Sequence, residues 1–323
     1  MTETTESALE INLPHAKGVF EAVVTGNKKI GPYFQKIKLT FSGDGAIAFA
    51  NCRPGQFAEL DLSNVSLPVP EKIPEELAEV SGRKILLRRP FSFTDVTVHG
   101  DKTVVDILYC VLGPATLRLT TLSTGASISV IGPLGNGFSV PEGKKYAFLI
   151  AGGMGTPPLQ HFAKILATNH QEIEVTVFAG AKLKQDLAVD GRIDEISLEL
   201  GFPLPEFARY GIESVLATDD GSIGYKGFVS DCFLEWLKQK DFNPGEAIIY
   251  ACGPEKMLAR MAQIAQEKNI DCQVSMERRM ACGINLCQGC AVECRLPNSS
   301  ETIYKMCCQD GPVFDSKEVI FAD

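Results

Sequence analysis

The chain lacks the features of membrane-spanning, secreted and nucleic-acid-binding proteins. No apolar run reaches the roughly 18 residues that a transmembrane helix needs. The polar start MTETTESALEINLP contains no basic and apolar signal region, so we expect a cytoplasmic protein without membrane contact. The net charge of −9 and the pI of about 5.1 lack the positive excess that neutralises phosphate backbones. Nucleic-acid binding is therefore not expected.

Histidine is also scarce. His15, His99, His161 and His170 are the four histidines of the chain, and none lies in a glycine-rich loop or beside a cysteine motif. The sequence therefore gives no indication of a Ser/His/Asp hydrolase.

Cysteine, by contrast, is plentiful. Of the eleven cysteines, six crowd into the segment that starts at residue 282, namely Cys282, Cys287, Cys290, Cys294, Cys307 and Cys308. A reducing compartment disfavours disulfides, so this crowding indicates a metal centre.

The spacing of these cysteines predicts the kind of centre. Cys282, Cys287 and Cys290 form the C-x4-C-x2-C pattern of plant-type [2Fe–2S] proteins. Glycines within the loop allow close wrapping of the backbone, whose amides can then donate to the sulfurs. A structural zinc site is the main alternative, but zinc prefers paired ligands. Cys294 is too near to be the fourth ligand, and spacing leaves Cys307 and Cys308 open because adjacent side chains in an extended segment point in opposite directions.

Residues 16–270 fall into two patterns. After a tail at residues 1–15, residues 16–142 contain short alternating runs at 18–24, 37–41, 57–62, 104–111 and 126–131, which predict an antiparallel β-barrel or sandwich. Residues 63–84 interrupt it and read as a surface insertion.

Residues 143–270 show a different hydrophobic pattern. Strand-like runs at 146–151, 173–178, 214–217 and 247–251 alternate with amphipathic segments near 157–168, 229–239 and 254–268. This alternation predicts an α/β domain with a parallel sheet, whose ligands bind beyond the carboxyl ends of the strands. Residues 271–323 would then form a small domain that depends on a cluster for its stability.

Four loops carry candidate cofactor contacts. They are Arg89-Pro90-Phe91-Ser92, Gly113-Pro114-Ala115-Thr116, the run Gly153-Met154-Gly155-Thr156 that opens a helix, and Cys252-Gly253-Pro254 after the last strand of the α/β domain. Arginine can pair with a phosphate, serine can reach a ring nitrogen, and a helix N-terminus favours an anion. The third loop departs from G-x-G-x-x-G, because Pro158 stands where the last glycine would be. Taken alone, a cysteine such as Cys252 is more often a small buried hydrophobe.

Taken in order, these motifs resemble the ferredoxin-reductase superfamily. Within it, the chain looks like the electron-transfer subunit of class 1B dihydroorotate dehydrogenase over nearly its whole length. The motifs that carry the resemblance are Arg89-Pro-Phe-Ser92, Gly132-Pro-Leu-Gly-Asn-Gly-Phe138, Thr218-Asp-Asp-Gly-Ser222 with Gly224-Tyr-Lys-Gly-Phe-Val229, Glu277-Arg-Arg-Met-Ala-Cys-Gly283 and Asp310-Gly-Pro-Val-Phe314.

The resemblance implies a multidomain protein with an FAD-binding barrel, an NAD-binding α/β domain and a small [2Fe–2S] domain. It also implies an FMN-containing dihydroorotate dehydrogenase catalytic subunit as partner, in a heterotetramer. Electrons would pass from that FMN through the cluster and FAD to NAD, in pyrimidine biosynthesis. The diaphorase subunit of a sulfhydrogenase or of a ferredoxin:NAD(P) oxidoreductase complex is the alternative, because it would share every cofactor site. A zinc-stabilised binding module is a third interpretation, which leaves the glycine loops unexplained.

The resemblance also assigns roles to single residues. Arg89 and Ser92 would contact FAD, with Ser92 beside its reactive nitrogen, and Gly113 and Thr116 would lie near its pyrophosphate. Gly153 and Gly155 would lie under the NAD pyrophosphate, with Cys252 at the nicotinamide and Cys308 as the fourth cluster ligand. Ser92 and Cys252 are thus the expected catalytic residues, and the remaining expected cofactor contacts are Pro90, Phe91, Ala115, Thr156, Gly253 and Pro254.

Two details complete these expectations. Asn285 stands where the family often has glycine, and asparagine tolerates the left-handed backbone. No arginine cluster follows residues 173–178, where Lys182 and Lys184 are the nearby cations, so we expect NAD rather than NADP.

Overall fold

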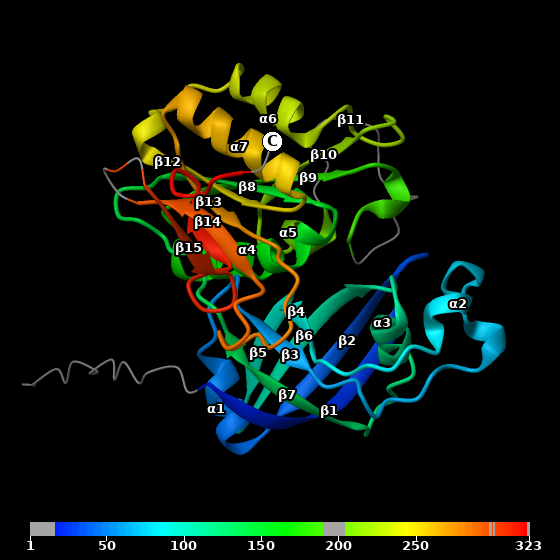
Figure 1. Ribbon diagram of the computed structural model, residues 1–323. Helices are drawn as coiled ribbons and strands as arrows, with labels where there is room; N and C mark the ends of the chain where they lie inside the picture. Colours follow the sequence, from blue (N-terminus) through cyan, green and yellow to red (C-terminus); the bar gives the residue numbers. More distant parts are fainter. Residues whose placement is uncertain (1–16, 190–203, 297–298, 300, 322–323) are drawn as a thin grey trace, which may run out of the picture.

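The computed structural model of the chain describes residues 17–189, 204–296, 299 and 301–321 (Figure 1). The expected tail at residues 1–15 lies outside the described residues. Two seven-stranded sheets, one above the other in Figure 1, make up most of the molecule, and a two-stranded hairpin lies beside the upper sheet.

The first sheet is antiparallel and curved into a half-barrel. Its strands are β1 (Gly18–Lys29), β2 (Phe34–Phe41), β3 (Phe57–Leu60), β4 (Arg89–Ser92), β5 (Asp95–His99), β6 (Lys102–Cys110) and β7 (Ser127–Leu134). Their order is β4-β3-β7-β1-β2-β6-β5, so the sheet is open, with β4 and β5 as its edge strands, where a barrel was expected. The alternation of apolar residues predicted β1, β2, β6 and β7 because one face of each strand packs on a common core.

Helices α1 (Gly43–Ala50) and α3 (Pro114–Leu119) complete this half. The sequence did not predict α1, whose eight residues include two glycines, a composition unfavourable to an isolated helix. It forms because Phe49 is buried and stacks on Phe41, with ring centroids 4.0 Å apart.

Residues 63–84 form the expected surface excursion, visible at the side of the half-barrel in Figure 1. They contain the 3₁₀ turns η1 (Pro70–Lys72) and η2 (Glu75–Leu77) and the short helix α2 (Ala78–Ser81). The excursion is attached to α3, because the buried Arg118 guanidinium donates to the Ser81 carbonyl at 3.1 Å and to the Pro114 carbonyl at 2.9 Å.

The second sheet is parallel except at one edge. Its strands are β8 (Tyr146–Gly152), β9 (Glu174–Ala181), β10 (Glu213–Thr218), β11 (Tyr225–Lys226), β12 (Ala247–Cys252), β13 (Asp271–Ser275) and β16 (Val313–Asp315), in the order β11-β10-β9-β8-β12-β13-β16. Helices α4 (Thr156–Asn169) and α5 (Pro205–Ala208) pack in one core, whereas α6 (Val229–Leu237) and α7 (Glu255–Lys268) pack in another. The short 3₁₀ turns are η3 (Gly153–Gly155), η4 (Lys184–Asp186) and η6 (Pro244–Glu246).

The cysteine-rich segment is built into this second half. Its hairpin, β14 (Ala291–Arg295) and β15 (Thr302–Met306), shares a hydrophobic core with the parallel sheet. Strand β13 pairs in parallel with β12, and β16 pairs antiparallel with β13, so residues from both ends of the segment belong to the sheet. The Asn136 side chain connects the motif at residues 132–138 with the motif at residues 310–314. Its amide nitrogen donates to the carbonyls of Asp310 and Val313, and its amide oxygen accepts the Val313 N–H, all at 2.8–2.9 Å.

A second set of contacts joins the two sheets. Lys164 of α4 donates to the Asp95 carboxylate at 2.6 Å and to the Val96 carbonyl at 2.7 Å, both on β5. His161, one turn earlier, is buried, and its burial lowers the pKa to about 4, so the imidazole is neutral at pH 7. None of the helices in the described part of the chain has the length and apolar character that crossing a bilayer requires.

Candidate cofactor sites

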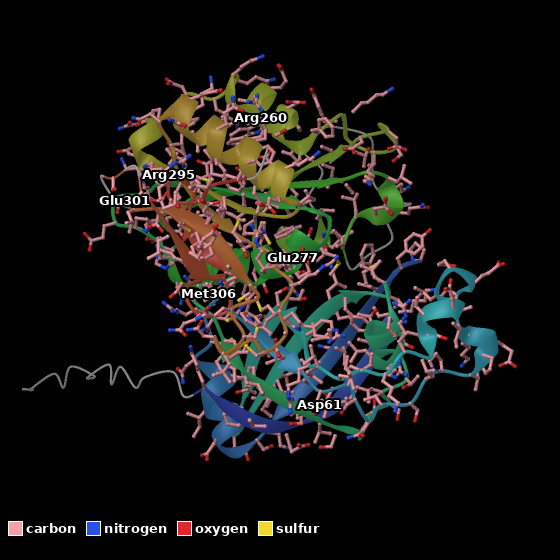
Figure 2. The ribbon with its side chains drawn as sticks, in the orientation of Figure 1. Asp61, Arg260, Glu277, Arg295, Glu301 and Met306 are labelled. Carbon is pink, nitrogen blue, oxygen red and sulfur yellow. The ribbon has the colours of Figure 1, made fainter. Side chains whose placement is uncertain are left out.

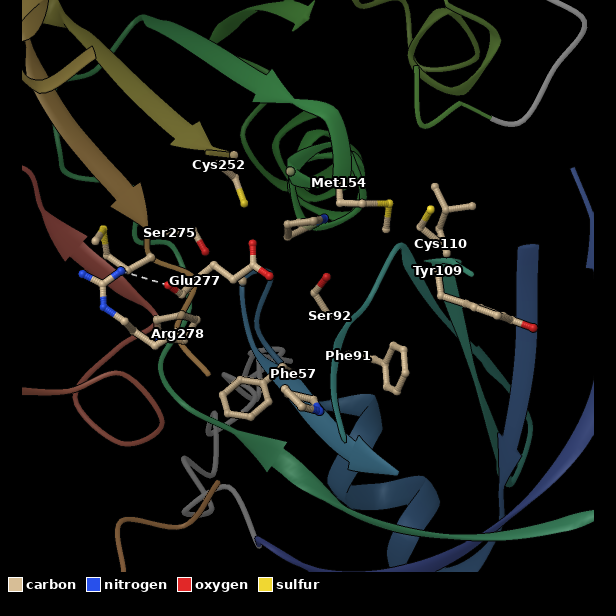
Figure 3. Close-up of a pocket in the computed structure, with 18 of the residues that line it drawn as sticks. Phe57, Phe91, Ser92, Tyr109, Cys110, Met154, Cys252, Ser275, Glu277 and Arg278 are labelled. Atoms are coloured by element: carbon tan, nitrogen blue, oxygen red, sulfur yellow. Dashed lines mark hydrogen bonds between the residues drawn. The ribbon is translucent and has the colours of Figure 1, made fainter. Parts of the chain in front are cut away.

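A cleft opens where the edge of the half-barrel faces the carboxyl ends of the parallel strands. Ser92 and Phe91 of β4 and Tyr109 of β6 line it from below, and Met154 and Cys252 line it from above (Figure 3). Gly155 also lines the cleft. Its volume is about 280 Å³. The structure thus brings the two expected catalytic residues, Ser92 and Cys252, to one cavity, although 160 positions separate them in the chain.

Arg89 and Pro90 lie at a second cavity, which they share with Gly253 and Pro254. The Arg89 guanidinium donates to the carbonyls of Leu87 at 2.8 Å and Arg88 at 3.0 Å. Arg88 points elsewhere, because it bonds Ser129 and lies 3.4 Å from the Asp61 carboxylate. Of the two arginines, Arg89 is therefore the one that lines a cofactor-sized cavity.

The turn at residues 113–116 is held by its own threonine. The Thr116 hydroxyl oxygen accepts the N–H groups of Leu112 at 3.0 Å and Gly113 at 3.2 Å. Thr116 also lines the cleft that contains Ser92 and Cys252, whereas the Ala115 side chain is buried in the half-barrel core. A contact of Ala115 with a cofactor would therefore involve its backbone, and the expected pyrophosphate contacts of this turn stay predictions.

The two glycines of the loop after β8 have different surroundings. Gly153 has φ +52°, and a Cβ placed there would meet nothing within 4 Å. A Cβ on Gly155 would lie 1.9 Å from the Cys252 carbonyl oxygen, so this glycine lets the ends of β8 and β12 pack together. Thr156 is buried, and its hydroxyl donates to the Gly153 carbonyl at 2.9 Å.

Cys252 carries a neutral thiol. Burial raises its pKa to about 12, although a hydrogen bond with Ser275 acts in the opposite direction. Ser275 and Glu277 line the same cleft, and Figure 2 shows Glu277 between the two halves of the molecule. Arg278 forms a bidentate ion pair with Glu255 at the start of α7, at 2.9 and 3.0 Å. Sequence reasoning assigned no role to Ser275, Glu255 or Arg278; Arg278 belonged to a quoted motif, but its partner is distant in the chain.

Backbone amides surround the sulfurs of residues 282–290, the cysteine loop. Cys282 Sγ accepts the N–H groups of Leu286 and Cys287 at 3.3 Å each, and Cys287 Sγ accepts that of Gly289 at 3.4 Å. Burial raises the pKa of Cys282, but the backbone amides around it outweigh burial and lower it to about 7. Such amides stabilise thiolates, the form in which cysteine binds metals.

The four cysteines expected as ligands lie near one another. Cys282 interacts with Cys287, and Cys308, whose burial raises its pKa to about 12, interacts with both Cys290 and Cys282. No three histidine, cysteine or acidic side chains in the described residues are placed to hold one metal ion. Four neighbouring cysteines that do not converge on one ion fit a [2Fe–2S] cluster, which has two irons and four cysteine ligands, better than a tetrahedral zinc ion.

The neighbours Cys307 and Cys308 point in different directions. Cys308 Sγ accepts the Asn285 N–H at 3.2 Å, so it faces the loop that carries the other three cysteines. Cys307 is fully buried, and its thiol donates to the Met276 carbonyl at 3.3 Å. The geometry supports Cys308 as the fourth ligand, which stays a prediction. Asn285 has φ +66°, the left-handed conformation expected of it.

Comparison with known proteins covers both the cysteine segment and the parallel sheet. Residues 277–320 match the iron-sulfur cluster binding domain of dihydroorotate dehydrogenase B, and residues 149–263 match the oxidoreductase NAD-binding domain. The solved structure of an NADH-dependent reduced ferredoxin-NADP oxidoreductase has a TM-score of 0.69 and 24% identity, covering 93% of this chain and 90% of that chain. That likeness concerns the fold. The two family matches define the class of protein, an NAD-linked oxidoreductase with an iron–sulfur cluster binding domain.

Curated relatives narrow the class. Proteins from Geobacillus sp. (strain WCH70) and Bacillus velezensis are both named dihydroorotate dehydrogenase B (NAD(+)), electron transfer subunit, and are 35% and 36% identical over 269 and 268 residues. The alignments cover 83% and 82% of this chain and 86% of each relative. The chain belongs to the family of dihydroorotate dehydrogenase B electron transfer subunits.

Proposed function

We propose that this chain carries electrons from the FMN of a dihydroorotate-oxidising catalytic subunit, by way of a [2Fe–2S] cluster and FAD, to NAD. The observation that carries the proposal is the meeting of three elements: the Ser92 strand, the Cys252 strand end and the linker to the cysteine loop line one cleft. A group bound there is in reach of both the nicotinamide side and the cluster side of the protein.

Each half of the molecule contributes a distinct task. In the segment from 16 to 142, Arg89 would hold an FAD phosphate and Ser92 would hydrogen-bond the flavin ring near its reactive nitrogen. In the segment from 143 to 270, Gly153 would allow close approach of the NAD pyrophosphate, while Gly155 keeps the two strand ends together. The neutral Cys252 thiol would pack beside the nicotinamide and stay protonated there.

Bound FAD supplies the chemistry that joins the two sides, because a flavin exchanges hydride with a nicotinamide and single electrons with a cluster. The protein contributes orientation and exclusion of water. Tyr109, Phe91 and Met154 line the cleft with apolar surface.

The segment from 271 to 323 would hold the cluster through Cys282, Cys287, Cys290 and Cys308 and provide the docking face. Ile284 and Leu286 of the cysteine loop are 46% and 78% exposed, as expected for the apolar centre of a contact with the catalytic subunit in a heterotetramer. None of the eleven cysteines forms a disulfide, which suits a reducing, cytoplasmic location.

Reconstitution tests this function. The chain alone should oxidise NADH with a dye as acceptor and show no activity on dihydroorotate, since the expected flavin site faces the nicotinamide and no cysteine, serine or lysine stands out as a base beside a second substrate pocket. With its cognate catalytic subunit, it should support dihydroorotate-dependent NAD reduction. Dihydroorotate oxidation by the chain alone would contradict the division of labour. Inactivity with the cognate subunit would instead favour a diaphorase role in another complex.

A further inference from the structure

A buried carboxyl lies where the half-barrel meets the cysteine loop. Glu59 of β3 is 1% exposed, and its Oε1 atom has no hydrogen-bond partner among the described residues. An unpartnered buried polar atom is costly, so such an atom in a folded protein calls for an explanation. Neither of the two catalytic assignments nor any expected cofactor contact involves Glu59.

Glu59 lies beside β4, the strand that carries Arg89 and Ser92. In the pairing of β3 with β4, Glu59 is opposite Pro90 and Phe57 is opposite Ser92. The charges of Arg88 and Arg89 act on the Glu59 carboxyl, although burial has the larger effect and raises its pKa. Glu59 is therefore in register with the strand that carries Arg89 and Ser92.

The other side of Glu59 faces the cysteine loop. A Cβ placed on Gly283, the residue after Cys282, would lie 2.4 Å from Glu59 Oε1 and 2.5 Å from its Cδ. Gly283 has φ +63°, so both its backbone conformation and its closeness to Glu59 require glycine. In Figure 1 the loop that precedes the hairpin reaches down to the half-barrel beside β3.

We propose that Glu59 is a positioning residue that sets the distance between the cysteine loop and β4. This distance in turn sets the rate of electron exchange between the [2Fe–2S] cluster and FAD. This inference rests on the proposed cofactors but not on the proposed partner. The Gly283 backbone packs directly on the Glu59 carboxyl group, and the β3–β4 pairing fixes the backbone from which this side chain extends. Shortening the side chain would let the loop shift, and electron exchange between separated centres falls steeply with distance.

The test uses the full chain with its own FAD and cluster. Stopped-flow mixing with NADH separates flavin reduction from the subsequent cluster reduction, and electron paramagnetic resonance reports the cluster environment directly. Glu59→Ala should leave flavin reduction unchanged, slow cluster reduction by about tenfold or more, and alter the resonance line shape. Glu59→Gln, which keeps the shape of the side chain, should restore both readouts.

A double-mutant cycle tests the contact itself. Gly283→Ala should lower the iron content, because its methyl group collides with Glu59. Adding Glu59→Ala removes the colliding atoms, so the double variant should regain part of the iron that Gly283→Ala lost, while the left-handed strain at residue 283 stays. Gly245→Ala is the control, since its Cβ would meet only Asn243 Oδ1 at 3.5 Å.

Three results would overturn the inference: cluster reduction and line shape unchanged in Glu59→Ala, equal damage from Gln and Ala, or strictly additive effects in the cycle. If Glu59→Ala does not fold, the Glu59→Gln and Gly283→Ala variants still test the inference. Unchanged iron content in Gly283→Ala would show that residue 283 does not pack on Glu59. Wild-type protein without iron or flavin would contradict the proposed cofactors instead, so the two failures are distinguishable.

Discussion

Cys307 and Cys308 allow a paired test of the cluster, since they are adjacent and both buried. We expect Cys308→Ser to remove or strongly alter the [2Fe–2S] cluster and Cys307→Ser to leave it intact. Cys308 Sγ accepts the Asn285 N–H of the loop, whereas the Cys307 thiol donates to the Met276 carbonyl.

The structure sets the size of each effect. A serine hydroxyl at 307 can still donate to Met276, so the loss is mainly the packing of a larger sulfur in a fully buried position, about 1–2 kcal/mol. Proteins of this kind are stable by about 5–15 kcal/mol, so the variant should remain folded with a modestly lower Tm. At 308 the substitution would remove one of the four expected iron ligands, and no side-chain packing compensates for a lost ligand.

Anaerobically purified variants are compared by iron and sulfide per FAD and by the visible spectrum. The flavin serves as an internal reference, because neither cysteine lines the flavin cleft. Cys307→Ser should keep the wild-type ratio of iron to FAD, and Cys308→Ser should lose most of it. The reverse pattern would refute the argument from side-chain direction, and loss in both variants would show that folding of the whole segment, rather than ligation, was measured.

Four further outcomes are expected. Gly155→Ala should destabilise the protein by about 3 kcal/mol or more and abolish NADH oxidation, as its methyl group would overlap the Cys252 carbonyl, while Gly245→Ala leaves both unchanged in thermal unfolding and dye-reduction assays. Lys164→Ala should lower Tm, because it leaves the part-buried Asp95 carboxylate without its 2.6 Å partner; an unchanged Tm would dismiss this link between the halves. The NADH pH profile should show no Cys252 ionisation between about pH 6 and 9, because a raised thiol pKa keeps the neutral form. NADH should be preferred over NADPH, and comparable kcat/KM values would contradict this.

The parallel strands show how far sequence reasoning extends. The runs at 146–151 and 247–251 became β8 and β12, since continuous apolar segments are stable only when both faces of a strand are covered. The β13 strand was not predicted, and its residues were assigned to the cysteine-rich segment. Five residues with little periodicity carry no local signal, and their strand exists because β12 offers a free edge.

For the half-barrel, the sequence predicted the strands but not the shape of the sheet. Alternating runs predicted its strands, but alternation is a property of single strands and does not decide whether a sheet closes. The open edge at β4 matters for function, because it is where the cleft forms and where Arg89 and Ser92 become accessible to a ligand.

The sequence by itself determined the chemistry of this protein. Cysteine spacing, the Arg-Pro-Phe-Ser run and the glycine loop are local patterns, because the ligands of one loop and the backbone of one turn are fixed by neighbours in the chain. Only the tertiary structure decided which residues meet across the molecule: Ser92 with Cys252, Glu255 with Arg278, and Glu59 with Gly283. It also turned Cys308 toward the loop and Cys307 away from it. The physical reason is the same in each case, since the direction of a side chain is set by strand pairing and packing between segments that are distant in sequence.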